Sequence, residues 1–319
     1  MKIYQLFYRA LSTYCPPSII ASFKNKIKPR RIKYFETNRP SCIKQQTIKK
    51  PVWLLWTFSL WSLKEKKIED SMEVGKTKIS KLIEEADKLF GLNKNREIIT
   101  VLGEFKDTKN VEILWRLVRA EYNLSQEQST SEAERKSLIF DAYTIILEAL
   151  EIDDNHYATH KWMAVLLDAR SAYDGLKARI TQLERVKSHM MRAAELNPKD
   201  ATTLYMIGNW CYQIADMPWI QRKIAATIFV APPTSSFEEA LPYFMKAEEV
   251  EPRFYSRNLL MLGKTYLKLK KDNHARYYLE LVVNYPPSSE DDRAASKEAN
   301  QLLSSMKPKQ EPLPKSVPV

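Results

Sequence analysis

Two histidines, His156 and His160, stand four residues apart on a segment whose apolar periodicity predicts a helix. That spacing puts both imidazoles on one helix face, where they could bind Zn²⁺. A zinc hydrolase of the H-E-x-x-H type has a glutamate directly after the first histidine, but Tyr157 stands there. Two ligands also leave zinc short of its usual four. We therefore interpret both as ordinary helix residues and expect no metal site.

Other residue patterns that support enzyme chemistry are absent from the 319 residues. The three cysteines, at positions 15, 42 and 211, form no C-x-x-C pair, which argues against a metal knuckle or a disulfide framework and suits a reducing compartment. All six glycines stand alone, so no glycine-rich phosphate loop can form and no nucleotide cofactor is expected. No nucleophile is accompanied by a recognisable base. We predict a protein that is not an enzyme.

The elements that carry these residues are predicted to be helices throughout. The chain is 44% hydrophobic and 28% charged, and proline is absent from residues 52–197. Few folds rich in strands or loops leave so long a stretch without proline. Apolar residues recur with the helical period from about Lys78 onward. The predicted class is all-α.

The helices follow the tetratricopeptide pattern, a repeat of about 34 residues built from a helix pair. From Ser256 onward, Gly263 and Tyr266 take the first-helix positions and Ala275 the small position of the second helix. Gly208 and Ala240 occupy the same positions one repeat earlier, but about 20 residues are inserted between them, and this insertion has helical periodicity. The predicted fold is a tetratricopeptide-like α-solenoid of antiparallel helix pairs with a helical insertion, preceded by a basic N-terminal segment.

Charge and composition divide the chain into four parts. Residues 1–50 carry the whole net charge of +11, and the rest is balanced, so a body that coats nucleic acid is not expected. This disordered segment is basic and amphipathic, which is typical of a mitochondrial targeting sequence; an untargeted basic arm that attracts anionic lipid or acidic tubulin is the alternative. Residues 75–306 form the repeat domain, and residues 307–319 a proline-rich, disordered tail.

Residues 51–74 comprise a tryptophan-rich apolar helix and a charged linker. The uncharged stretch at 52–63 is too short to span a bilayer. Its tryptophans, with lysines on both flanks, suit a membrane interface. A helix that docks on the following domain, or the tail of a targeting region, is an equal alternative. The interface residues are Trp53, Trp56 and Trp61.

Several runs in residues 75–306 resemble the regulator of microtubule dynamics family. Three of them are Glu112–Ala120, Ala194–Thr202 and Met217–Ala225, and a fourth is Phe254–Lys268. The resemblance implies a non-enzymatic adaptor of the cytoplasm and cytoskeleton that associates with microtubules and spindle poles and supports microtubule dynamics and chromosome segregation. It also implies a mitochondrial pool. The alternative is a mitochondrial or membrane-contact protein whose repeat domain binds lipid or a peptide.

The repeat register predicts which side chains of the first helices line a groove. These are polar, basic and aromatic residues suited to an acidic, extended ligand such as a tubulin tail, although they could equally face solvent. Trp219, beside Arg222 and Lys223, marks a second basic and aromatic candidate, but we expect this tryptophan in the core. The predicted groove residues are His160, Met163, Arg170, Tyr205, Asn209, Tyr212, Arg257 and Lys264.

Overall fold

Side-chain oxygens at the starts of the helices explain where several of them begin. In the computed structural model, which describes residues 77–306, the Asn110 side chain accepts hydrogen bonds from the backbone N–H groups of Glu112 and Ile113. Ser131 and Ser236 cap later helices in the same way. Such caps satisfy backbone donors that a helix start leaves free. The predictions made for residues 1–50, for Trp53, Trp56 and Trp61, and for residues 307–319 lie outside the described residues.

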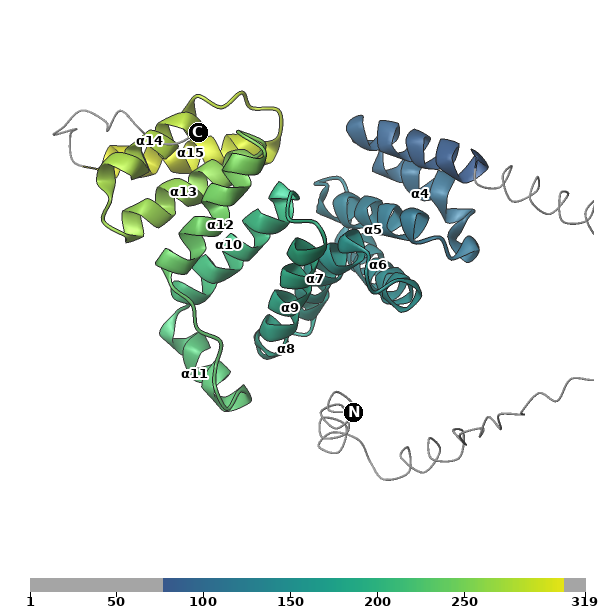
Figure 1. Cartoon of the computed structure of the whole chain (residues 1–319), viewed down its shortest axis with the longest axis horizontal. Helices are drawn as coiled ribbons and strands as arrows, with labels where there is room; N and C mark the ends of the chain where they lie inside the picture. The colour runs from purple at the N-terminus through teal and green to yellow at the C-terminus, as the bar shows by residue number, and fades with distance from the viewer. Residues whose placement is uncertain (1–76, 307–319) are drawn as a thin grey trace, which may run out of the picture. The chain divides into compact units, whose positions relative to one another are not determined.

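All regular structure in residues 77–306 is helical, as predicted (Figure 1). The first described helical segment covers residues 77–91. The elements that follow it are α4 (Asn95–Gly103), the short 3₁₀ turn η1 (Lys106–Thr108), α5 (Val111–Gln126), α6 (Glu132–Ile152), α7 (Tyr157–Tyr173), α8 (Leu176–Thr181), α9 (Leu183–Leu196), α10 (Ala201–Ala215), α11 (Trp219–Ile228), α12 (Phe237–Val250), α13 (Ser256–Lys268), α14 (Asp272–Val283) and α15 (Glu290–Ser305).

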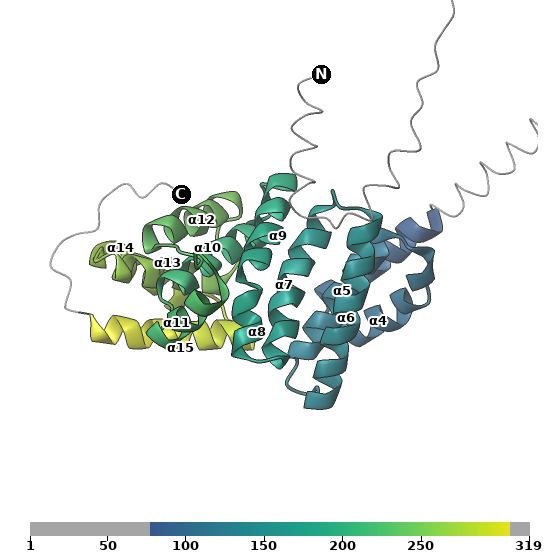
Figure 2. The same ribbon diagram turned by 90° about the horizontal axis from the view of Figure 1, so that it is seen from below.

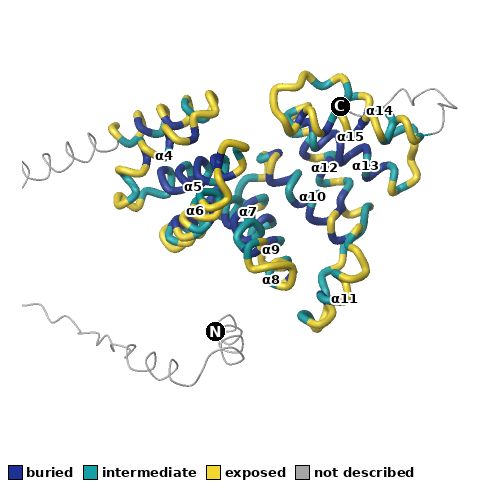
Figure 3. Tube along the Cα trace, turned by 180° about the vertical axis from the view of Figure 1, so that it is seen from behind, coloured by how far each residue is buried: buried dark blue, intermediate teal, exposed yellow. Residues whose placement is uncertain are grey.

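The helices pack as successive pairs, and the pairs stack along the chain (Figures 1 and 2). Helix α5 pairs with α6, α7 with α9, α10 with α12, and α13 with α14. Helix α15 then covers the last pair by packing on both α13 and α14. This arrangement is the predicted α-solenoid. Its core runs along the facing sides of the helices, where the buried residues lie (Figure 3).

The small residues of the repeat pattern lie where the paired helices touch. A Cβ atom added at Gly263 would lie 2.7 Å from the Cγ of Leu279, and one added at Gly208 would lie 2.8 Å from the ring of Phe244. Carbon atoms in contact normally lie about 3.5–4.0 Å apart. A larger residue would therefore overlap the partner helix at both positions. The other repeat-packing residues, Ala240, Tyr266 and Ala275, are buried.

The predicted insertion is helix α11, which lies between α10 and α12. A second, shorter helix, α8, is inserted in the same way between α7 and α9, and the two inserted helices contact each other. Trp219, which we expected in the core, is 64% exposed, so that expectation was wrong. The reason is that α11 buries only Ala225 in full, and its opposite face carries Trp219 into solvent.

Candidate functional site

The predicted groove residues on α7 have different surroundings. Met163 is only 1% exposed, so this side chain packs in the core, and the prediction that it contacts a ligand was wrong. Arg170 forms an ion pair with Asp174 and lies 5.0 Å from the ring of Phe140. His160 is partly exposed at the start of the helix. Of these three, His160 and Arg170 remain at the surface.

On α10, burial sets the role of the two predicted tyrosines. Tyr212 is 4% exposed and packs against Phe237, so it too is a core residue rather than a ligand contact. Tyr205 packs against the ring of Tyr255 on the next repeat, and burial raises the pKa of its hydroxyl to about 12. Tyr205 is therefore neutral at physiological pH. Asn209 is partly exposed on the same helix.

The two predicted bases on α13 are paired with acids of α15. Arg257 lies 2.6 Å from the Asp291 carboxylate, and Lys264 lies 2.7 Å from that of Glu298. The hydrogen bond that Arg257 donates to Asp291 holds the pKa of Arg257 above its usual value. An acidic segment does bind here, but it is α15, the last helix of the described residues. An external acidic ligand would have to compete with the carboxylates of α15 for these two bases.

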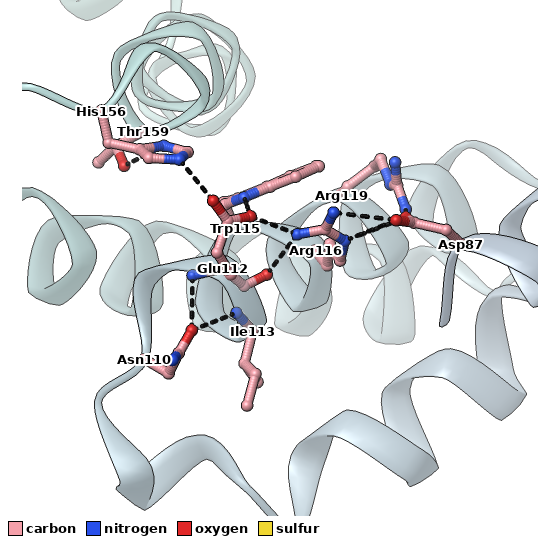
Figure 4. Close-up of polar contacts among 9 residues, drawn as sticks. All are labelled: Asp87, Asn110, Glu112, Ile113, Trp115, Arg116, Arg119, His156 and Thr159. Carbon is pink, nitrogen blue, oxygen red and sulfur yellow. Dashed lines mark hydrogen bonds and ion pairs between the residues drawn. The ribbon is translucent and has the colours of Figure 1, made fainter. Parts of the chain in front are cut away.

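A polar network near the N-terminal end of the repeat domain was not predicted from the sequence (Figure 4). Arg116 and Arg119 on α5 both donate to the carboxylate of Asp87 in the first described helix. Glu112 accepts hydrogen bonds from Trp115 and Arg116 and contacts His156 at 3.0 Å. His156 was expected within a helix, but it is the extended residue that precedes α7. Burial by itself would raise the pKa of Glu112, but these hydrogen bonds outweigh it and lower the pKa. The network joins three helices through charges that compensate one another.

His156 and His160 do not act together as the zinc spacing would require. His156 contacts Glu112, whereas the Nδ1 atom of His160 lies 2.9 Å from Nδ1 of His189 on α9. Within residues 77–306 no three side chains of histidine, cysteine, aspartate or glutamate are grouped to hold a metal ion.

Hydrogen bonding fixes the protons of the His160–His189 pair. The Nε2 atom of His160 lies 2.8 Å from the carbonyl oxygen of Asp154, which can only accept. His160 therefore donates through Nε2, and in its neutral form its Nδ1 accepts from Nδ1–H of His189. Burial, followed by the charges of His160 and Arg185, lowers the pKa of His189 to about 4. The His189 ring is therefore neutral at physiological pH.

Two adjoining hollows lie along α9, and we call them together the α9 trough. One has a volume of about 430 Å³ and the other about 450 Å³, and both are lined by Ser188 and Met191. Trp210 lies in the second hollow, where Lys187 stands 4.6 Å from its ring. The remaining lining residues are Asp154, His160, Glu184, His189, Arg192, Glu195, Pro232, Pro233 and Thr234. The first hollow is lined mainly by polar and charged side chains, and the second adds Trp210 and two prolines. Such a mixed surface suits an extended peptide.

Sequence comparison identifies the family. The family described as regulator of microtubule dynamics protein 1-3 matches residues 82–307, which includes nearly every described helix. The chain belongs to the regulator of microtubule dynamics family. Regulator of microtubule dynamics protein 1 of Pongo abelii is 43% identical over 232 residues, covering 73% of this chain and 74% of that protein. The human protein 1 is 46% identical over 195 residues, covering 61% and 62%.

More distant members extend the comparison, and a solved structure supports the fold. Regulator of microtubule dynamics protein 3 of Rattus norvegicus is 30% identical over 239 residues, covering 74% of this chain and 50% of that protein. A thermophilic TPR protein of Thermus thermophilus is similar in structure, with a TM-score of 0.50 and 13% identity, covering 70% of this chain and 98% of that one. At that identity the likeness shows only the tetratricopeptide-like fold. Across the described part of this family member, no helix is long and apolar enough to cross a membrane.

Proposed function

We propose that this protein is a non-enzymatic adaptor that associates with microtubules and supports their dynamics. Membership of the regulator of microtubule dynamics family over residues 82–307 carries this proposal. Further support comes from the fold, because helical-repeat proteins act through extended surfaces rather than through a catalytic centre.

The α9 trough is the proposed binding surface for a partner protein. Its two hollows adjoin, so they can hold a segment of several residues. Lys187 and Arg192 line it, and each is already within ion-pair distance of a glutamate, Glu239 and Glu195. The proposed partner segment carries acidic residues that compete with these glutamates, as a tubulin tail does. His160, predicted from the repeat register, contributes to the same surface.

Cosedimentation of the full chain with polymerised tubulin tests the proposal. The wild-type chain should pellet with microtubules, and less so at higher salt, because salt screens exposed charges. Arg192→Glu and Lys187→Glu should each weaken binding several-fold. Arg293→Glu is a matched control, because Arg293, like Arg192, pairs with a glutamate three residues away on its own helix.

Two outcomes would count against the proposal. Absence of wild-type cosedimentation would remove microtubules as the direct partner. If Arg257→Ala and Lys264→Ala weakened binding while the trough variants did not, the partner surface would be the inner groove at α13 instead.

The proposed locations are the cytoplasm, the microtubule cytoskeleton and the spindle poles, with a mitochondrial pool directed by residues 1–50. Sequencing the N-terminus of the mature protein from cells tests the last point. A cleaved N-terminus in the mitochondrial fraction is expected; an intact Met1 there would contradict removal of a targeting segment.

A further inference from the structure

Large apolar side chains are exposed on the two inserted helices, α8 and α11, which we call together the insert tip. Trp219 is 64% exposed, Ile220 53% and Leu176 45%. Val230, just after α11, is also fully in solvent. These four are most of the exposed large hydrophobic residues of the described chain, where Leu92, Leu147 and Ile152 are the others. Such a concentration marks an interaction surface.

The charges of the insert tip all have one sign. Helix α8 contains Lys177 and Arg179, helix α11 contains Arg222 and Lys223, and neither helix contains an acid. Arg179 is paired with Asp168 of α7, but among the described residues Lys177 and Lys223 have no carboxylate within ion-pair distance. Arg222 donates to the backbone carbonyls of Met217 and Ala215, so its charge is not compensated. The tip is therefore basic as well as apolar.

The exposed face of α11 combines both properties at its centre. Trp219 and Lys223 are one turn apart, and the Lys223 ammonium lies 4.7 Å from the Trp219 ring centre. Ala225, on the opposite side, is buried and attaches the helix to the repeat body. A helix held on one side can present its other side to a partner without unfolding.

We propose that the insert tip docks on a membrane surface that contains anionic lipid. Tryptophan rings favour the interface between lipid headgroups and acyl chains, and nearby lysines are attracted to anionic headgroups. The 10-residue helix α11 is about 15 Å long, so it lies along the surface rather than crossing it. Because the four exposed apolar residues of the tip stand beside bases and none of them lines the α9 trough, a broad lipid surface fits them better than an extended acidic peptide, which would be held in a trough.

Vesicle flotation of the full chain tests this proposal. Serine replaces Trp53, Trp56 and Trp61 in every sample, so that these tryptophans cannot supply the binding. The basic residues 1–50 are present in every sample, so their attraction to anionic lipid is the same in all variants and the comparison between variants isolates the tip. On this background, vesicles of phosphatidylcholine with about 30% phosphatidylserine should bind the protein more tightly than phosphatidylcholine alone. The added variant Trp219→Ser/Ile220→Ser should lower the partition coefficient about tenfold. Lys223→Gln should lower it about fivefold at low salt.

Matched controls separate the tip from general surface effects. Leu92→Ser/Leu147→Ser removes two exposed leucines elsewhere, and Lys88→Gln removes an exposed charge on the first described helix. These variants should bind as the background does. Equal binding by the tip variants and the background would overturn the proposal. Equal binding to the two vesicle types would also overturn it. Poly-glutamate serves as an acidic peptide: if the tip variants lost binding to it but bound vesicles as the background does, the tip would be a peptide surface and the proposal would be overturned.

A local probe gives an independent reading. Cys15→Ser/Cys42→Ser leaves only the buried Cys211, and Ala226→Cys then places a polarity-sensitive dye on the exposed face of α11. Its emission should shift to the blue when anionic vesicles are added, while the same dye at Leu92→Cys should not respond. No shift at position 226 would overturn the proposal even if the chain floats.

Discussion

Replacement of Gly208 by alanine should destabilise the repeat domain, although alanine normally stabilises a helix. The added Cβ would lie 2.8 and 2.9 Å from two ring atoms of Phe244 and 3.1 Å from a third. Reaching an ordinary carbon contact requires a shift of about 0.7 Å or more. Phe244 is fully buried, and its carbonyl accepts a hydrogen bond from Asn258 on the next repeat, so the ring and its backbone have little freedom to move.

Opposing contributions set the size of the effect. Overpacking of a core costs about 1–3 kcal/mol. The higher helix propensity of alanine offsets about 1 kcal/mol of that cost. We expect a net loss of up to about 2 kcal/mol in the free energy of unfolding, which for a domain of this size lowers Tm by up to about 8 °C. Urea unfolding of the full chain, followed by circular dichroism, measures it.

Gly103→Ala is the matched control. Gly103 ends α4, and a Cβ added there would meet no atom within 4 Å. This variant should be neutral or up to about 1 kcal/mol more stable. Adding Phe244→Leu to Gly208→Ala should recover part of the loss, giving a coupling of about 1 kcal/mol in a double-mutant cycle. The reasoning is refuted if Gly208→Ala is as stable as Gly103→Ala, or if the cycle is strictly additive.

Three further predictions concern ionisable groups. The folded pKa of His189, about 4, lies below its unfolded value, so the free energy of unfolding should fall by about 1 kcal/mol, discounted for partial exposure, as pH drops from 6.5 towards 4. His189→Gln should flatten this part of a series of unfolding measurements across pH. An unchanged slope would contradict the assignment. Burial, with a smaller effect of Asp141, raises the pKa of Glu121 to about 8, so the free energy of unfolding should fall as pH rises from 4.5 to 8. Glu121→Gln should recover on the order of 2 kcal/mol at pH 8 in the same denaturation assay. Equal stability of the two proteins at pH 8 would disprove the raised pKa. Burial alone would raise the pKa of Asp292, but hydrogen bonds from Ser256, Ser289 and Ser288 lower it to about 2. Asp292→Ala should therefore lower the free energy of unfolding by about 2–4 kcal/mol above pH 4, and by progressively less as the pH falls and the wild type is protonated. A loss that does not change with pH would contradict the hydrogen-bonded carboxylate.

The helices and their small contact residues could be predicted because their signals are local. Apolar side chains three and four residues apart must share one helix face wherever the helix packs. Gly208 and Gly263 mark close helix contacts because only a missing side chain allows such an approach. The inserted helix α11 was predictable for the same reason, since its periodicity is a property of its own residues. The family could be predicted as well, because several runs are particular to it.

Which side chains meet across helices was decided by the tertiary structure alone. Arg257 and Lys264 were predicted as free groove bases, yet they pair with acids 34 residues away, because α15 packs on α13. His160 pairs with His189 rather than with His156, which precedes α7, because α9 packs against α7. Periodicity tells which face of a helix is apolar, but Trp219 shows that it cannot tell whether another helix covers that face. Coverage depends on how the pairs stack, and here the stacking leaves the outer side of α11 in solvent.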